Sequence, residues 1–274
     1  MNILQTYLNQ QLVKAGFPDG LKIEYHLDYC QGDGVAFYGR LYQEDLIRLF
    51  NHLNPSKRKQ NMFTKLLGHL IEWGESRCIR ISKNWFGYRY ANWNCMEIVA
   101  DEAEYQPFFS TGKKDWYFPK GKVHKYMTLW DEFLLKLKEH IQCTSKYLAT
   151  VGYQIAEATP REEQVAYCFN TVNYRIELVQ TPCEFYAEKP EWLFGDLCDV
   201  DEMMQSVVEG KIHFANLYAQ VLDKQTGLSL GEDHLSNLSF SPKDRFFSGY
   251  KTELISNAIA DARRNVQKYA QLHA

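Results

Sequence analysis

No two cysteines in this sequence are spaced as C-x-x-C, although the chain has seven cysteines among its 274 residues. The seven are odd in number and lie far apart: Cys30, Cys78, Cys95, Cys143, Cys168, Cys183 and Cys198. A disulfide framework and a zinc ribbon both fit this spacing poorly. We therefore expect a protein that needs no disulfide and works in a reducing compartment.

The sequence also lacks a long apolar run and an excess of charge of one sign. No stretch approaches the roughly 20 apolar residues of a membrane-spanning helix, and residues 1–17 read as an amphipathic helix without the layout of a signal peptide. The net charge is −3, from 34 acidic and 31 basic residues. This balance argues against a general nucleic-acid binder, which is usually basic, and against a DNA mimic, which is strongly acidic. We expect a cytoplasmic protein with no membrane partner.

The common motifs of catalysis and nucleotide binding are missing. The chain contains no G-x-x-x-x-G-K-[ST] loop, no H-E-x-x-H pair and no G-x-G-x-x-G fingerprint. Their absence lowers the expectation of the common enzyme classes and favours a role other than catalysis. No cofactor is predicted, and nothing in the sequence indicates a substrate.

What the chain does have is ample apolar material, with 45% hydrophobic and 15% aromatic residues. Segments of helical spacing are mixed with alternating segments, which predicts an α+β protein with antiparallel sheets and packed helices. Pro107, Gly112, Pro119 and Gly121 interrupt the pattern midway. We therefore predict two modules, residues 1–104 and 130–274, joined by a linker or long loop at 105–129.

The first predicted module begins with the helix at 1–17. A hairpin follows, in which Leu21–Cys30 and Val35–Tyr42 turn around Asp33-Gly34, a sequence suited to a tight turn. Two helices, Gln43–Leu53 and Lys57–Glu72, come next, and then three strands at 76–82, 85–90 and 93–101. In the second module we predict helices at Trp130–Ala149, Val200–Glu209 and Lys251–Tyr269, and strands at Tyr174–Thr181 and Lys211–Asp223.

Potential metal ligands occur on the first predicted strand, at His26, Asp28 and Cys30. Alternation would place all three on one face. However, their Cβ atoms would lie roughly 6.5–7 Å apart along an extended strand, which is wide for one ion, so we interpret them as a polar strand face and predict no metal site. Asp33 could act as a catalytic carboxylate, and an enzyme built around the His26–Asp33 hairpin is the third alternative for function.

A basic segment rich in aromatic residues suggests a nucleic-acid contact. Lysines can bind phosphates and aromatic rings can stack on bases, and the residues that would do so are Lys113, Lys114, Trp116, Lys120 and Lys122. Lys125 and a smaller basic stretch at 54–60 are further candidates for phosphate contacts. Because the whole chain is slightly acidic, we rank nucleic-acid binding second.

The leading hypothesis is a protein–protein interface on the hairpin predicted near Ala91-Asn92. Tryptophan, tyrosine and arginine dominate the energetics of interfaces, and five such residues crowd this hairpin: Trp85, Tyr88, Arg89, Tyr90 and Trp93. The alternative is that half of them face the core, since residues of odd and even position point to opposite faces of a strand. The oligomeric state is not predicted.

Two stretches resemble proteins of phages and plasmids. The sequence LDYCQGDGVAFYGRL is similar to a Q-G-D-G hairpin signature of small accessory proteins of unknown function, and 89–96 is similar to a later R-Y-x-H-x-x-x-M segment, with Asn92 in place of the histidine. Residues 221–263, ending in Ala260-Asp261-Ala262-Arg263, resemble the C-terminal part of such proteins. The resemblance implies a mobile-element accessory protein, of the kind that includes anti-CRISPR inhibitors, whose partner would be a host or defence-system protein.

Overall fold

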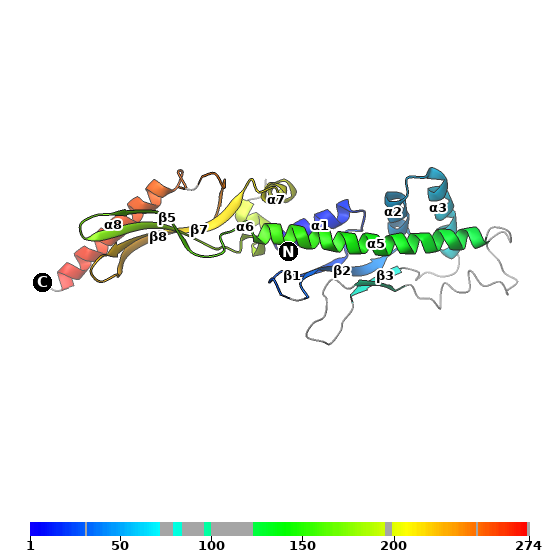
Figure 1. The fold of residues 1–274 in the computed structure, drawn as a ribbon, viewed down its shortest axis with the longest axis horizontal. Coiled ribbons are helices and arrows are strands. Elements are labelled where there is room, and N and C mark those ends of the chain that lie inside the picture. The colour runs from blue at the N-terminus through cyan, green and yellow to red at the C-terminus, as the bar shows by residue number, and fades with distance from the viewer. Residues whose placement is uncertain are drawn as a thin grey trace. The chain divides into compact units, whose positions relative to one another are not determined.

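The computed structural model describes residues 1–30, 32–71, 79–83, 96–99, 123–194, 199–244 and 246–272. Within them, α-helices accompany two antiparallel sheets of four strands each, which confirms the predicted α+β class (Figure 1). The chain forms two compact units. We call Leu8–Gly152 the N-terminal unit, and Met1–Tyr7 together with Tyr153–Ala274 the C-terminal unit.

The sheet of the N-terminal unit has the order β1-β2-β3-β4, and each neighbouring pair is antiparallel. Its strands are β1 (Lys22–His26), β2 (Gly34–Leu41), β3 (Ile79–Lys83) and β4 (Met96–Val99). The predicted hairpin is confirmed, because Lys22 pairs with Tyr38 and His26 with Gly34. The first strand is shorter than predicted and ends at His26. Tyr29 has a φ of 59°, a left-handed conformation that takes the chain out of the strand direction.

The helices of this unit agree closely with the sequence pattern. They are α1 (Ile3–Lys14), whose first residues belong to the other unit, α2 (Gln43–Leu53), α3 (Lys57–Ile71) and α5 (Val123–Ala156). Helices α2 and α3 begin at the predicted residues. Of the three strands predicted after α3, the first and third correspond to β3 and β4, and the one at 85–90 lies outside the described residues.

Helix α5 is longer than predicted and corrects two sequence-based expectations. It begins at Val123 because Val123, Tyr126, Leu129 and Trp130 are buried at helical spacing, which extends the apolar stripe about two turns before the predicted start. Residues 123–129, including Lys125, are therefore helix and not loop. Most of α5 also belongs to the N-terminal unit, so the division between the units differs from the predicted one at 105–129.

An aromatic core explains why α5 packs in the N-terminal unit. The rings of Phe50 and Phe63 stack with their centroids 4.0 Å apart, and Phe133 of α5 meets Phe63 edge-on at 4.7 Å. On the sheet side, the Ser145 hydroxyl donates to the carbonyl oxygen of Val35 at 2.6 Å. Large rings thus fill the space between α5 and its neighbouring helices α2 and α3, as in ordinary core packing.

The sheet of the C-terminal unit is an antiparallel meander in the order β5-β6-β7-β8. Its strands are β5 (Gln164–Asn170), β6 (Tyr174–Thr181), β7 (His213–Asp223) and β8 (Ser229–Phe240), and its helices are η2 (Phe185–Ala187), α6 (Pro190–Phe194), α7 (Val200–Val208) and α8 (Lys251–Leu272). The predicted β6, β7, α7 and α8 are confirmed, with bounds that differ by at most a few residues. Strands β5 and β8 were not predicted.

Helix α8 approaches the sheet unusually closely, through small residues. Its buried face presents Leu254, Ala258 and Ala262. A Cβ atom on Gly231 of β8 would lie 2.2 Å from the backbone nitrogen of Ala262 and 2.6 Å from the carbonyl oxygen of Ala258. Only glycine fits at this position, because those two obstacles are backbone atoms that cannot turn aside.

In the described part of the chain, no helix combines the length and the apolar character needed to cross a membrane.

Candidate functional site

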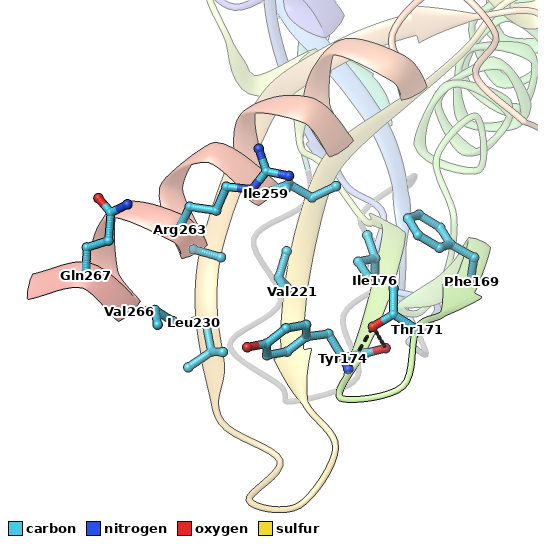
Figure 2. A pocket seen from close by; sticks show the side chains of 11 residues that line it. Phe169, Thr171, Tyr174, Ile176, Val221, Leu230, Ile259, Arg263, Val266 and Gln267 are labelled. Atoms are coloured by element: carbon cyan, nitrogen blue, oxygen red, sulfur yellow. Dashed lines mark hydrogen bonds between the residues drawn. The ribbon is translucent and has the colours of Figure 1, made fainter. Parts of the chain in front are cut away.

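An apolar groove lies beside α8, over the part of the sheet that the helix leaves uncovered. Because the buried face of α8 rests on β7 and β8, the α8-facing side chains of β5 and β6 remain at its flank. A hollow of about 440 Å³ is found here (Figure 2). Its walls are formed by Phe169, Thr171, Tyr174, Ile176, Val221, Leu230, Ile259, Ala262, Arg263, Val266 and Gln267.

The hollow continues along α8 toward the start of that helix. A second hollow of about 470 Å³ shares Phe169, Ile259 and Arg263 with the first, so the two adjoin. Its far end is lined by Lys251 and Tyr167, where the lysine Nζ lies 4.3 Å from the ring centroid. We call the two together the α8 groove. The groove follows α8 from Lys251 to Gln267, which is about 24 Å at about 1.5 Å per residue.

Alternation along the strands sends apolar side chains into this groove. On β5 and β6, Tyr167 pairs with Leu178 and Phe169 with Ile176, and all four belong to or pack on the apolar cluster beneath α8. Figure 2 shows Ile176, Val221 and Leu230 on successive strands, facing Ile259 and Val266 of the helix. The groove floor therefore continues the core, with Ile176 and Val221 buried and Leu230 and Ile259 half-buried beside them.

The opposite face of the same sheet is polar and its groups are paired. Glu177, only 5% exposed, is held by Arg175 and by the Gln220 amide, which donates at 3.0 Å. The Tyr218 hydroxyl donates to Glu163 at 2.9 Å, and burial together with this carboxylate raises the pKa of Tyr218 to about 12. The apolar groove and the polar face thus give the sheet two chemically different sides.

Few polar groups interrupt the groove, and two of them, Lys251 and Arg263, carry charge. The Arg263 guanidinium points over the hollow in Figure 2, and among the described residues no carboxylate pairs with it. The nearby Asp261 instead contacts Arg264 at 3.1 Å. At the floor, Thr171 and Tyr174 hold the β5–β6 turn, since the Tyr174 backbone N–H donates to the Thr171 hydroxyl at 3.0 Å. Arg263 is therefore the group most available to an anionic ligand.

Exposed apolar side chains lie at one end of the groove, where two turns meet. The β5–β6 and β7–β8 turns are joined by a hydrogen bond from the Lys224 backbone N–H to the carbonyl oxygen of Asn173 at 2.9 Å. Val172 at the tip of the first turn is 92% exposed, and Leu228 after the second is 64% exposed. Apolar groups gathered at a hollow are typical of an interaction surface.

The structure also brings the two basic stretches of the sequence together in the N-terminal unit. The first turns of α3 and α5 enclose a hollow of about 510 Å³ lined by Arg58, Lys59, His124 and Lys125 among others. One acidic residue, Glu132, also lines it and binds Lys59 at 2.8 Å. We call this the basic hollow. The other proposed nucleic-acid ligands, Lys113, Lys114, Trp116, Lys120 and Lys122, lie outside the described residues.

The five residues proposed for protein binding, Trp85, Tyr88, Arg89, Tyr90 and Trp93, also lie outside the described residues. Sequence reasoning did not identify the α8 groove, because two of the strands that form it were not recognised. A signal was nevertheless present. The C-terminal stretch that resembles accessory proteins contains both Gly231 and Arg263, and the structure places the first under α8 and the second over the groove.

No protein-family model matches this sequence, and no curated protein and no solved structure matches it.

Proposed function

We propose that this protein acts by binding another protein, and that the α8 groove takes an apolar segment of the partner that also carries a carboxylate. The observation that supports this most is the apolar hollow beside an Arg263 that has no carboxylate partner among the described residues. Leaving such a surface in water is unfavourable by about 25 cal/mol per Å² of apolar area. A ligand that covers it recovers that free energy.

Length and charge favour a peptide segment over a small molecule. Each hollow alone is within the range of about 300–1,000 Å³ of small-ligand sites, but the two adjoin over about 24 Å of helix. An amphipathic segment laid along α8 could fill both, as in helix-in-groove recognition. Pairing by the outer edge of β5 is disfavoured, because a bulge between Val165 and Tyr167 breaks the register of that strand.

A selection from a peptide library displayed on phage or yeast, against the full-length protein, tests this proposal. We expect enriched peptides with apolar residues at helical spacing and at least one Asp or Glu. Arg263→Glu should weaken their binding about tenfold or more, the equivalent of about 1.4 kcal/mol. Arg264→Glu is the matched control, because Arg264 is the next residue and already faces Asp261. If no acidic apolar motif is enriched, or if both variants behave alike, the proposal is wrong.

A mobile-element origin, with a host or defence-system protein as the partner, is part of the same proposal and rests on the resemblance of the Q-G-D-G hairpin. An anti-CRISPR-like role belongs to the same proposal and rests on that origin alone. The hairpin at 85–93 stays a second predicted contact region.

The basic hollow supports nucleic-acid binding as the second candidate function. Two helix N-termini, each with a positive end of its dipole, meet there with Arg58, Lys59 and Lys125. Among the described residues that line the hollow, one ion pair, Lys59 with Glu132, offsets this charge. The hollow could therefore hold a phosphate group, and its salt dependence is predicted in the Discussion.

A further inference from the structure

Three side chains of different chemistry converge where the first hairpin turns, although the sequence predicted His26 and Cys30 to lie apart along one extended strand. The prediction assumed a strand that continues through Cys30, but β1 ends at His26. The turn then folds back, with Tyr29 in the left-handed region. As a result, one potential ligand atom from each of His26, Cys30 and Asp33 lies within 4.8 Å of the others.

The contacts in this turn orient each of the three groups. His26 Nδ1 lies 2.7 Å from Asp33 Oδ1, and its Nε2 lies 3.1 Å from Asp28 Oδ2. Asp33 is fixed from the other side as well, because its Oδ2 accepts a hydrogen bond from the Cys30 backbone N–H at 2.9 Å. The Asp33 side chain is 7% exposed, whereas Cys30 and Asp28 are exposed. The cluster is therefore anchored at its base and open to solvent at one side.

We propose that this turn binds one zinc ion through His26 Nδ1, Cys30 Sγ and a carboxylate oxygen of Asp33. A thiolate and an imidazole are ligands that zinc prefers and that calcium and magnesium do not. On binding, the Cys30 thiol gives its proton to solvent, since the thiolate is the ligand. The exposed side of the cluster leaves the fourth tetrahedral position for water or for a group of another molecule.

Small movements suffice to convert the hydrogen-bonded cluster into a coordination site. Ligand nitrogen and oxygen atoms at about 2.0–2.1 Å from zinc in a tetrahedron are about 3.3 Å apart, so His26 Nδ1 and Asp33 Oδ1, now 2.7 Å apart, must separate by about 0.6 Å. His26 Nε2 keeps its contact with Asp28 meanwhile. A carboxylate on the second nitrogen of a metal-bound histidine fixes the tautomer and orients the ring. Asp28 therefore supports the site without binding the ion.

Titration of the full-length, reduced protein with Co²⁺, followed by displacement with Zn²⁺, tests this site. We expect one Co²⁺ per chain, with a thiolate-to-cobalt charge-transfer band in the near ultraviolet and intense visible bands that report tetrahedral geometry. Cys30→Ser should abolish the charge-transfer band, and His26→Gln should abolish the tetrahedral spectrum. Zinc should displace the cobalt stoichiometrically.

Cys143→Ser is the matched control, because Cys143 is also an exposed free cysteine but has no part in the turn. Circular dichroism of each variant shows whether its fold is kept. Asp28→Ala should retain one bound ion with an affinity lower by about 10–100-fold, the usual effect of losing such a supporting carboxylate. The proposal is overturned if folded wild-type protein binds no cobalt with a thiolate band, if the band survives in Cys30→Ser, or if Cys143→Ser abolishes it equally.

Discussion

The two sheets of this protein are alike in size and connection order, but they meet their long helices in different ways. In the N-terminal unit, a side-chain hydroxyl lies between α5 and the sheet, because Ser145 donates to the carbonyl oxygen of Val35 on β2, and the Phe133 ring of α5 packs on Phe63 of α3. In the C-terminal unit, α8 rests directly on the backbone of β8 at Gly231. A helix held so closely to one edge covers only that part of the sheet, and the apolar side chains of β5 and β6 form the α8 groove. Close packing of small residues thus creates the exposed surface beside it.

Adding one methyl group at the closest contact should have the largest effect. In Gly231→Ala the new Cβ would meet backbone atoms of Ala262 and Ala258 at 2.2 and 2.6 Å, so α8 must move. We expect the C-terminal unit to lose more than about 3 kcal/mol of stability, the upper range for overpacking. Chemical denaturation with hydrogen exchange resolved by peptide would show the loss and place it in β8 and α8.

The corresponding change in the N-terminal unit should be mild. A Cβ on Gly152 of α5 would lie 2.7 Å from the end of the Leu27 side chain, which can rotate away, and alanine favours a helix over glycine by about 1 kcal/mol. Gly152→Ala is therefore expected to stay within about 1 kcal/mol of the wild type. Gly249→Ala, with nothing within 4 Å, is the control and should be nearly neutral. Equal losses in all three variants would contradict the proposed difference between the two helices.

Each sheet also holds a carboxylate that pairs with basic side chains. The two sites differ in how exposed those basic side chains are to water. On β1, Glu24 accepts hydrogen bonds from Lys22 at 2.8 Å, from Lys83 at 2.6 Å and from the Tyr38 hydroxyl. These donors, Lys22 first, lower the pKa of Glu24 to about 2. The Lys83 side chain is only 4% exposed, whereas Arg175 beside Glu177 is 50% exposed.

We expect Glu24→Gln to cost about 3 kcal/mol at neutral pH, since it removes the carboxylate next to a buried ammonium group. Glu177→Gln should cost about 1 kcal/mol, because water can solvate Arg175. The pKa of Glu24 is lower in the folded protein than its ordinary value of 4.5, so its contribution is complete above about pH 4.5 and is lost as the pH falls toward about 2. Urea denaturation from pH 7 to pH 3 should show the wild type approaching Glu24→Gln. A constant difference over that range would contradict this assignment.

The α8 groove should bind an apolar anion even without its natural partner. An anilinonaphthalene sulfonate dye combines an apolar ring system with a charge that suits Arg263, and we expect it to bind the folded protein at one main site. Ile259→Asp should weaken this binding about tenfold, or about 1.4 kcal/mol, because it places a carboxylate on the groove wall. Leu135→Asp is the control, since Leu135 is 61% exposed on α5 and lines neither hollow of the groove. Fluorescence titration measures both, and equal loss in both variants would exclude the groove as the dye site.

The sequence was sufficient to predict the helices and strands in which apolar residues recur at one regular spacing. Strand β6 matches its predicted bounds, and α2 begins and ends where expected, because Pro55 and the apolar stripe act together. Strand β8 was missed because its sequence is mostly polar and contains a glycine. Gly231 is required by a contact with α8, a helix later in the sequence, and no local pattern reveals that contact. Strand β5 was missed because its bulge interrupts the alternation.

The candidate sites were less predictable than the fold, because they depend on contacts between distant or irregular segments. The α8 groove requires β5, β6 and the C-terminal helix to be placed together, which no local pattern encodes. The zinc proposal depends on where β1 ends. The alternating pattern predicted a strand that continues through Cys30. In the structure, the left-handed conformation of Tyr29 redirects the chain and brings the Cys30 side chain close to His26. The backbone conformation of one residue therefore decides whether these side chains form a polar strand face or a set of potential metal ligands.

The smallest expected effect concerns the basic hollow, and it separates the two candidate functions. If phosphate binding occurs there, affinity falls with salt, because each neutralised phosphate releases counterions. We expect the wild type to bind single- and double-stranded oligonucleotides only weakly, in the range of about 10⁻⁴–10⁻⁶ M at physiological salt. The net charge of −3 provides no long-range attraction for a polyanion. Arg58→Ala and Lys125→Ala should each flatten the slope of log affinity against log salt by at most about 1.

Fluorescence anisotropy at two salt concentrations measures these slopes. Lys59→Ala is a useful third variant, because Lys59 is already neutralised by Glu132 at 2.8 Å and its loss should change the slope least. Binding of an acidic peptide in the α8 groove should vary much less with salt, since most of its free energy would come from apolar area. Nanomolar oligonucleotide binding that Arg58→Ala and Lys125→Ala abolish, while Arg263→Glu leaves it intact, would make nucleic-acid binding the leading function and the groove a secondary surface.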